Sequence, residues 1–190
     1  MRIAVANIKG GVGKTTTAVY LAAAAAERRN GPVVLVDADR QASSAEWLEE
    51  RPIEGLTVVE APSERTLAKA AGRRGGTIVI DTPPGDHRLL AAAIATANAV
   101  VVPTRAGGVE LSPALQTIDL IPAKTPRGVV VSSARFGTND LDDTIAWWRE
   151  QKVPIWGVIP ERVGIASGPE ARLSREGLEL FAAVLRKARG

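Results

Sequence analysis

The chain has 190 residues, of which 45% are hydrophobic and 24% charged, a composition that excludes disordered, fibrous and disulfide-stapled classes and fits one globular domain. It contains no cysteine, so disulfides, thiolate metal sites and iron–sulfur clusters are excluded. The net charge of +3 permits a polyanionic partner without requiring one.

Short runs rich in Val and Ile alternate along the chain with runs rich in Ala and Leu. The predicted strands are Arg2–Ile8, Val33–Asp37, Leu56–Glu60, Thr77–Asp81, Ala99–Val102, Gly128–Ser132 and Ile155–Ile159. Helices are predicted between them, including Thr15–Arg29, one capped by Ser63, Asn139–Glu150 and Ser174–Ala188. Nearly continuous apolar runs are typical of strands buried on both faces. Residues 1–190 are therefore predicted to form a single α/β domain, with a mostly parallel central sheet of about seven strands covered by helices on both faces.

The first predicted strand leads into a glycine-rich loop that opens the first predicted helix. Glycines let consecutive backbone N–H groups turn inward around an anion, and a helix N-terminus adds its dipole. This context predicts a P-loop NTPase that binds ATP, with Lys14 on the β- and γ-phosphates and the Thr15 hydroxyl on Mg²⁺. The residues assigned to phosphate binding are Gly10, Gly11, Val12, Gly13, Lys14, Thr15 and Thr16.

Two other predicted strands end in aspartates. Asp37 and Asp39 alternate at one strand end, and such a pair beside a phosphate loop suits Mg²⁺ and a hydrolytic water. The alternative is that both acids cap a following helix. Asp81 ends the apolar run before Thr82-Pro83-Pro84-Gly85, a Walker B pattern in which the aspartate holds Mg²⁺ through water.

The phosphate loop departs from the usual G-x-x-x-x-G-K-[ST] pattern, because Ile8 stands where the first glycine belongs and Lys9 precedes the glycines. The form K-G-G-x-G-K-T resembles the deviant Walker A motif of the ParA/MinD family of ATPases. The resemblance extends from Met1 to about Gly168 and is strongest to short ParA-type partition ATPases. It implies that Lys9 reaches across a nucleotide-sandwich dimer to the partner's phosphates. The alternative is that Lys9 is a solvated surface lysine.

The same resemblance implies roles for the acids. The stretch around Asp37 is similar to the family motif D-x-D-P-Q, with Arg40 in place of the proline. By this resemblance Asp39 positions the attacking water and Asp37 supports the water shell of the metal. The loop after Asp81 resembles the family's switch loop, which senses the γ-phosphate.

The stretch Gly157-Val158-Ile159-Pro160-Glu161-Arg162 resembles the segment with which family members hold adenine through backbone groups. Pro160 and Glu161 are the candidates, and a plain strand-to-loop turn is the alternative. Many relatives have an asparagine at the end of the preceding strand, where this chain has Ser132-Ser133-Ala134-Arg135. The choice of ATP over GTP therefore stays open at this point.

The resemblance implies a slow, partner-stimulated ATPase that acts as a switch in plasmid or chromosome partition. ATP would drive a homodimer that binds non-specific DNA on the nucleoid, and a centromere-binding ParB-like adaptor would trigger hydrolysis and release. Basic side chains would contact mainly DNA phosphates, unless each is simply a solvated surface charge. The candidates are Arg135, Arg162, Arg172, Arg175, Arg186 and Lys187.

Two alternatives remain. A MinD-like membrane-surface positioning ATPase would use the terminal run 175–190 as an amphipathic membrane helix, although we expect this run to be the last core-packing helix. A small dethiobiotin-synthetase-like ATP-dependent ligase shares the fold but would need a small-molecule pocket. The sequence shows no signal peptide and no apolar run near the roughly 20 residues that span a bilayer, so we expect a cytoplasmic protein without membrane contact.

Overall fold

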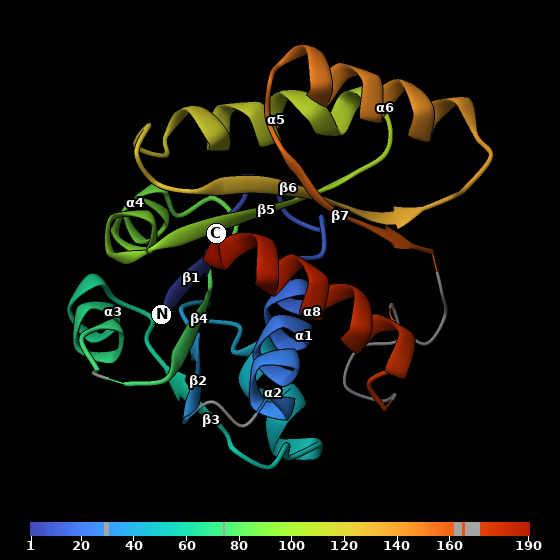
Figure 1. Ribbon diagram of the computed structural model, residues 1–190. Helices are drawn as coiled ribbons and strands as arrows, with labels where there is room; N and C mark the ends of the chain where they lie inside the picture. Colours follow the sequence, from blue (N-terminus) through green and yellow to red (C-terminus); the bar gives the residue numbers. More distant parts are fainter. Residues whose placement is uncertain (29–30, 74, 162–164, 166–171) are drawn as a thin grey trace.

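Seven parallel strands form one sheet in the order β3-β2-β4-β1-β5-β6-β7 in the computed structural model (Figure 1). The structure describes residues 1–28, 31–73, 75–161, 165 and 172–190. The strands are β1 (Arg2–Val5), β2 (Val33–Asp37), β3 (Leu56–Glu60), β4 (Thr77–Asp81), β5 (Ala99–Arg105), β6 (Arg127–Ala134) and β7 (Ile155–Pro160). The helices are α1 (Lys14–Glu27), α2 (Ser43–Glu50), α3 (Glu64–Ala71), α4 (His87–Thr96), α5 (Gly108–Asp119), α6 (Asn139–Glu150) and α8 (Arg175–Arg189).

Helices cover both faces of the sheet. In β1, Ile3 and Val5 belong to the core formed with α1, α2 and α8, whereas Ala4 belongs to the core formed with α3, α4, α5 and α6. Figure 1 shows the same two layers, with α1 and α8 on one side of the sheet and α5 and α6 on the other. Successive side chains of a strand point to opposite faces, so a strand buried on both faces has no polar face. The predicted fold class is confirmed, and every pairing in this sheet is parallel.

The register aligns the carboxyl ends of the central strands. Val5 of β1 and Asp37 of β2 both pair with Asp81 of β4. In open parallel sheets, ligands bind beyond these ends. The phosphate loop after β1 and the acids after β2 and β4 are therefore brought to one edge.

The end of β1 differs from the predicted one, because side-chain hydrogen bonds take the place of the strand's backbone hydrogen bonds there. β1 ends at Val5 and not at Ile8, because the Asn7 amide reaches the carbonyl of Pro103 while its oxygen accepts from the backbone of Lys9. An apolar pattern cannot reveal this exit. Ser63 caps α3 as predicted, and Thr66 completes a capping box. No bounds were predicted for α2, α4 and α5. Arg29 lies outside the described residues.

Helix α8 packs on α1 through its apolar face. The rings of Tyr20 and Phe181 stack with centroids 5.2 Å apart, and the backbone N–H of Ser174 donates to the Tyr20 hydroxyl. Val184 and Leu185 are fully buried beneath the helix. The expectation of a core-packing helix is confirmed, because this face is already covered by the domain itself. No helix in the described ranges has the length and apolarity that a membrane crossing requires.

Phe181→Ala tests how strongly α8 depends on this contact. Phe181 is 1% exposed, so truncation leaves a cavity and should lower the free energy of unfolding by about 3–4 kcal/mol in urea denaturation. The matched control is Phe136→Ala, because Phe136 is 67% exposed and its loss should change stability by less than about 0.5 kcal/mol. Equal effects of the two substitutions would contradict the packing described here.

Candidate functional site

The phosphate loop forms a backbone cradle at the N-terminus of α1. Gly11 and Gly13 have φ of 73° and 90°, in the left-handed region that glycine adopts without steric cost. Gly13 occupies the N-cap position, no side chain caps the helix, and its first turn holds no acidic residue. The first N–H groups of α1 are thus left for an anion, and the helix dipole favours negative charge there.

Lys14 lies in this cradle with its side chain turned back on the loop. The residue is 7% exposed, and its Nζ donates to the backbone carbonyl of Lys9 at 2.7 Å. Burial lowers the pKa of Lys14, and the nearby carboxylates of Asp81 and Asp39 act in the opposite direction. A mostly buried ammonium that donates to a backbone carbonyl is well placed to exchange that contact for a phosphate oxygen.

Asp81 is the least satisfied charged group at the site. It is 1% exposed, and its Oδ1 has no hydrogen-bond partner in the described part of the chain. Burial, with repulsion from Asp37, raises the pKa of Asp81 to about 7, and Thr15 and Lys14 act in the opposite direction. A buried carboxylate oxygen without a donor is the kind of ligand that Mg²⁺ prefers.

A magnesium ion therefore fits beside Asp81, but only together with a ligand. The described ranges contain no group of three or more His, Cys, Asp or Glu side chains that could hold an ion alone. Mg²⁺ commonly takes one or two protein ligands and completes its shell with water and substrate phosphates. Asp81 and Thr15 would hold the ion here.

Asp37 holds the N-terminus of α2. Its Oδ2 accepts from the backbone N–H groups of Ser44 and Ala45 at 3.0 Å and from the Ser44 hydroxyl at 2.7 Å, while Oδ1 accepts from the backbone of Asp39 at 3.0 Å. The helix-capping alternative thus describes Asp37 well. A metal role of Asp37 stays a prediction, and these four donors compete with it.

Asp39 lies on a cleft shared with the predicted switch loop. Its Oδ1 accepts from the backbone of Gln41 at 3.0 Å, and the residue is half-buried. A cleft of about 540 Å³ is lined by residues 38–40 on one side and 83–89 on the other. Asp39 therefore faces the loop that follows Asp81, as its predicted role at an attacking water requires.

The switch loop is tied to the phosphate loop at its base. The Thr82 hydroxyl donates to the carbonyl of Val5 at 2.9 Å, and the backbone N–H of Gly85 donates to the carbonyl of Ile8 at 3.4 Å. A side chain at Gly10 would lie 3.6 Å from Pro84. A shift of the phosphate loop on binding an anion would therefore also displace residues 82–85.

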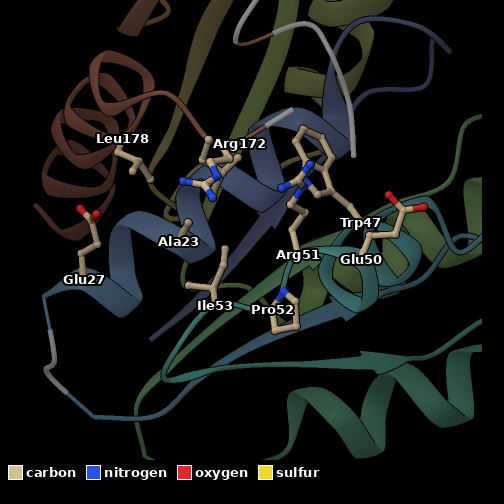
Figure 2. A pocket seen from close by; sticks show the side chains of 10 residues that line it. Ala23, Glu27, Trp47, Glu50, Arg51, Pro52, Ile53, Arg172 and Leu178 are labelled. Atoms are coloured by element: carbon tan, nitrogen blue, oxygen red, sulfur yellow. The ribbon is translucent and has the colours of Figure 1, made fainter. Parts of the chain in front are cut away.

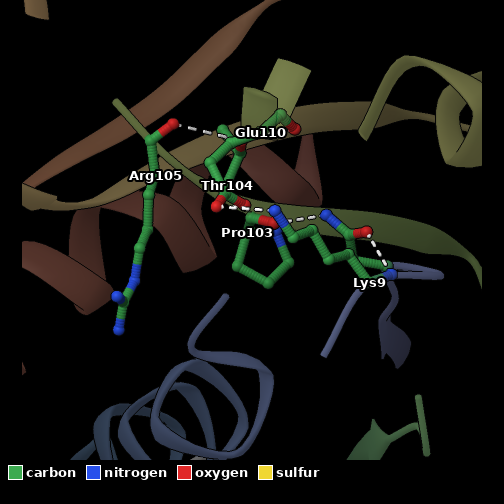
Figure 3. Close-up of polar contacts among 6 residues, drawn as sticks. Lys9, Pro103, Thr104, Arg105 and Glu110 are labelled. Atoms are coloured by element: carbon green, nitrogen blue, oxygen red, sulfur yellow. Dashed lines mark hydrogen bonds and ion pairs between the residues drawn. The ribbon is translucent and has the colours of Figure 1, made fainter. Parts of the chain in front are cut away.

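Lys9 is partly exposed and takes part in an ion pair. Its Nζ pairs with Glu110 Oε1 of α5 at 2.7 Å, and Figure 3 shows the two residues with Pro103 and Thr104 around them. Within one chain, the Lys9 side chain thus lies against the first turn of α5. The predicted role of Lys9 in a second chain stays a prediction.

The predicted base-binding residues lie at the ends of β6 and β7. Pro160 lines a narrow cavity of about 100 Å³ with Gly13, Thr16, Ser132 and Phe181. Both oxygens of Glu161 accept from the guanidinium of Arg135, and its backbone N–H donates to the carbonyl of Ala134. The role of Pro160 in base binding stays a prediction, and the Glu161 side chain and N–H are already engaged.

Sequence reasoning missed the residues that shape this cavity and loop. Ser132 lies within hydrogen-bond distance of the carbonyls of Val12 and Thr104, both at 3.0 Å, and so ties β6 to the phosphate loop. Ser133 has φ of 50°, which is costly for a residue with a side chain. Asn7 and Glu110 were also missed. Only Asn7 had a local signal, as a polar residue between an apolar strand and the glycines.

Of the predicted DNA-binding residues, Arg172, Arg175, Arg186 and Lys187 lie on or just before α8, whereas Arg135 follows β6. Arg135 is paired with Glu161 at the carboxyl edge. Arg175 pairs with Glu179 on α8, and Lys187 bonds the carbonyl of Ile155 at the start of β7. Arg186 is exposed near the end of α8. Arg162 lies outside the described residues.

Arg172 lines a cavity of about 440 Å³ away from the phosphate loop, at the other end of α1 (Figure 2). Arg51 and Arg172 extend toward the same space beside Trp47, and Glu27 lies at the edge. Ala23 and Glu27 lie nine and thirteen residues beyond Lys14, so this cavity is roughly 14–20 Å along α1 from the phosphate cradle. A substrate bound in this cavity would therefore not reach a phosphate bound in the cradle.

Comparisons with known proteins agree with this geometry. The sequence model of the CobQ/CobB/MinD/ParA nucleotide binding domain matches residues 3–174. The chain is 38% identical to the maintenance of carboxysome distribution protein A of Gloeobacter kilaueensis over 68% of this chain and 62% of that protein. It is 33% identical to the chromosome-partitioning ATPase Soj of Thermus thermophilus over 88% of this chain and 84% of that protein. The chain thus spans less than two thirds of the first relative and most of the second.

A solved structure has the same fold. The septum site-determining protein MinD of Pyrococcus horikoshii, complexed with Mg-ADP, superposes with a TM-score of 0.79 at 19% identity, covering 98% of this chain and 94% of that one. At this identity the likeness concerns the fold alone.

Asp81→Asn tests the buried carboxylate. In the nucleotide-free, metal-free protein the folded state holds a proton on Asp81 up to about pH 7, whereas an unfolded aspartate loses it near 3.8. Folded protein thus binds more protons in this window, so the free energy of unfolding should fall as pH rises through it. We expect a loss on the order of 2 kcal/mol between pH 5 and 8 in urea denaturation with EDTA.

The Asp81→Asn variant should lack this slope, and the control Asp143→Asn, which changes an exposed aspartate, should keep it. A variant at Asp81 with the wild-type slope would show that another group titrates.

Proposed function

This chain belongs to the CobQ/CobB/MinD/ParA family of nucleotide-binding domains, and on that basis we propose that it is a ParA-type ATPase whose ATP-bound homodimer binds non-specific DNA. The observation that carries the nucleotide assignment is the uncapped N-terminus of α1 with Lys14 inside it and the unpartnered oxygen of Asp81 beside it. An anion cradle, a buried cation and a free carboxylate oxygen together fit a metal-bound polyphosphate.

The chain's own residues have distinct roles in this proposal. Lys14 leaves the carbonyl of Lys9 and takes phosphate oxygens, so the loop's internal contact is replaced by the ligand's. Mg²⁺, held at Asp81 and Thr15, would neutralise developing negative charge on the phosphates. Asp39 orients the attacking water from the cleft that it shares with residues 83–85. The base lies against Pro160 and Ser132.

Hydrolysis is coupled to a change of state through the switch loop. Thr82 and Gly85 bond β1 and the phosphate loop, so loss of the γ-phosphate alters the surface formed by residues 82–85. In the proposed dimer this surface lies near the partner's site, and Lys9 reaches the partner's phosphates. A positive charge supplied by a second chain acts as an arginine finger does elsewhere.

The proposed partners are DNA on the nucleoid and a ParB-like adaptor that stimulates hydrolysis. Four of the candidate residues, Arg172, Arg175, Arg186 and Lys187, lie on or just before α8, and a dimer would present two such sets to one duplex. The relative Soj is named for chromosome partitioning, which supports a plasmid or chromosome as cargo. The relative in Gloeobacter kilaueensis is named for carboxysome distribution, so the same switch could position a protein cargo on DNA.

The alternative functions have less support. The apolar face of α8 is buried, so this helix is not available as a MinD-like membrane anchor. The cavity beside Trp47 lies at the far end of α1, where a ligase substrate would be out of reach of the phosphates, whereas the cleft between residues 38–40 and 83–89 is proposed here to hold the attacking water.

The test of this proposal measures mass by light scattering and co-sedimentation with duplex DNA, with ATP, with ADP and without nucleotide. We expect a dimer and DNA binding only with ATP, and binding that weakens steeply with salt because it rests on phosphate contacts. Lys9→Ala should bind nucleotide but stay monomeric, and the control Lys69→Ala, an exposed lysine on α3, should behave as wild type. Anionic liposomes serve as a further arm. ATP-dependent binding to them without DNA binding would refute the partition assignment, and ATP turnover only with an added organic acid would indicate the ligase.

Asp39→Ala tests the hydrolytic step. If Asp39 orients the attacking water, the variant should bind ATP and dimerise but hydrolyse ATP at least about 100-fold more slowly, which traps the DNA-bound dimer. Phosphate release and the lifetime of the DNA complex report the two effects. Asp140→Ala on α6 is the control for removing an exposed acid. Normal turnover in Asp39→Ala would assign the role to another residue.

A further inference from the structure

Lys9 is held by an acid that no motif singled out. Glu110 Oε1 lies 2.7 Å from Lys9 Nζ, and the side chains are 33% (Lys9) and 22% (Glu110) exposed. The pair joins the first residue of the phosphate loop to the first turn of α5 (Figure 3). A partly buried pair of this kind is screened less by water and salt than a surface ion pair.

The backbone around Lys9 is fixed independently of its side chain. Its N–H donates to Asn7 Oδ1 at 2.9 Å. The neighbouring N–H of Ile8 donates to the Thr117 hydroxyl at 3.1 Å. The Lys9 side chain can therefore change partners while the loop stays in place.

Glu110 depends on Lys9 for its charge balance. Its Oε2 is buried and has no hydrogen-bond partner among the residues that the structure describes. The N-terminal turn of α5 stabilises the carboxylate, but Lys9 is the one cation that an ion pair brings to it in those same ranges. When Lys9 leaves, a poorly solvated carboxylate loses its cation, and this cost opposes the departure.

We propose that Glu110 is a positioning residue that holds Lys9 within its own chain and thereby sets the threshold for ATP-driven dimerisation. This inference rests on the proposed function, in which Lys9 acts in a second chain. Lys9 then exchanges one carboxylate for the partner's phosphates. The γ-phosphate gives ATP more negative charge than ADP, so ATP in the partner's site competes better with Glu110 for the Lys9 ammonium. The Lys9–Glu110 pair therefore restricts dimerisation to the ATP state.

The first measurement is the reactivity of Lys9 in the nucleotide-free monomer. Acylation by an N-hydroxysuccinimide ester is followed by peptide mass spectrometry, with the exposed Lys152 as internal reference. Glu110→Gln keeps the shape of the side chain and removes its charge, so Lys9 should react about 3–5-fold faster. The control Asp119→Asn removes a charge at the other end of α5 and should leave Lys9 unchanged. Unchanged reactivity in Glu110→Gln would overturn the inference.

The second measurement is dimerisation with a non-hydrolysable ATP analogue. Each dimer releases two Lys9 side chains, so Glu110→Gln should lower the dimer dissociation constant by about tenfold. The control Asp119→Asn removes a charge at the other end of α5 and should leave the dissociation constant unchanged, which separates action through Lys9 from a general change of charge on α5. Weaker dimerisation in Glu110→Gln, or an equal effect of Asp119→Asn, would overturn the inference.

The two proposals fail in distinguishable ways. A wild-type chain that stays monomeric with ATP would refute the dimer switch, while the acylation rates would still decide whether Glu110 restrains Lys9. Thermal unfolding of each variant, unchanged from wild type, shows that α5 remains folded.

Discussion

The central position of β1 is the constraint on which the site depends. β1 pairs with β4 on one side and β5 on the other, so the phosphate loop that follows it must emerge between Asp81 and Arg105. Asn7 ends the strand by bonding across to Pro103, and the loop begins at a defined point. Since the strands are buried on both faces, a shift of β1 by one residue would exchange its two core faces. The position of Lys14 relative to the acids is therefore set by the packing of the whole sheet.

This packing concentrates charge where water is scarce. Asp37 and Asp81 are adjacent across the strands and buried, and Lys14 lies near Asp81. Asp37 is satisfied by the N-terminus of α2, whereas Asp81 retains an unpartnered oxygen. The two aspartates have the same chemistry but different surroundings, and among the described residues Asp81 alone of the two has a carboxylate oxygen without a hydrogen-bond donor. The buried and unpaired oxygen of Asp81 destabilises the nucleotide-free site, and a bound ligand that pairs with it removes this cost. Nucleotide binding is therefore expected to stabilise the folded protein.

Ion pairs and hydrogen bonds also hold the basic side chains that are expected to contact a partner. Lys9 is paired within its own chain, and Arg175 and Lys187 on α8 are held by Glu179 and by the carbonyl of Ile155. A single chain thus has its Lys9 engaged internally. The proposed role of Lys9 requires a second chain, which is consistent with a protein whose state depends on nucleotide.

The sequence by itself determined the strand and helix alternation, the phosphate loop and the acids that end β2 and β4, because these depend on local patterns of apolar residues, glycines and spacing. Only the tertiary structure decided that Asp37 caps α2, that Arg135 neutralises Glu161 and that Glu110 holds Lys9. Each of these contacts joins side chains whose meeting depends on how strands and helices pack. Lys9 and Glu110 are 101 residues apart, and no local pattern shows that the first turn of α5 lies against the phosphate loop.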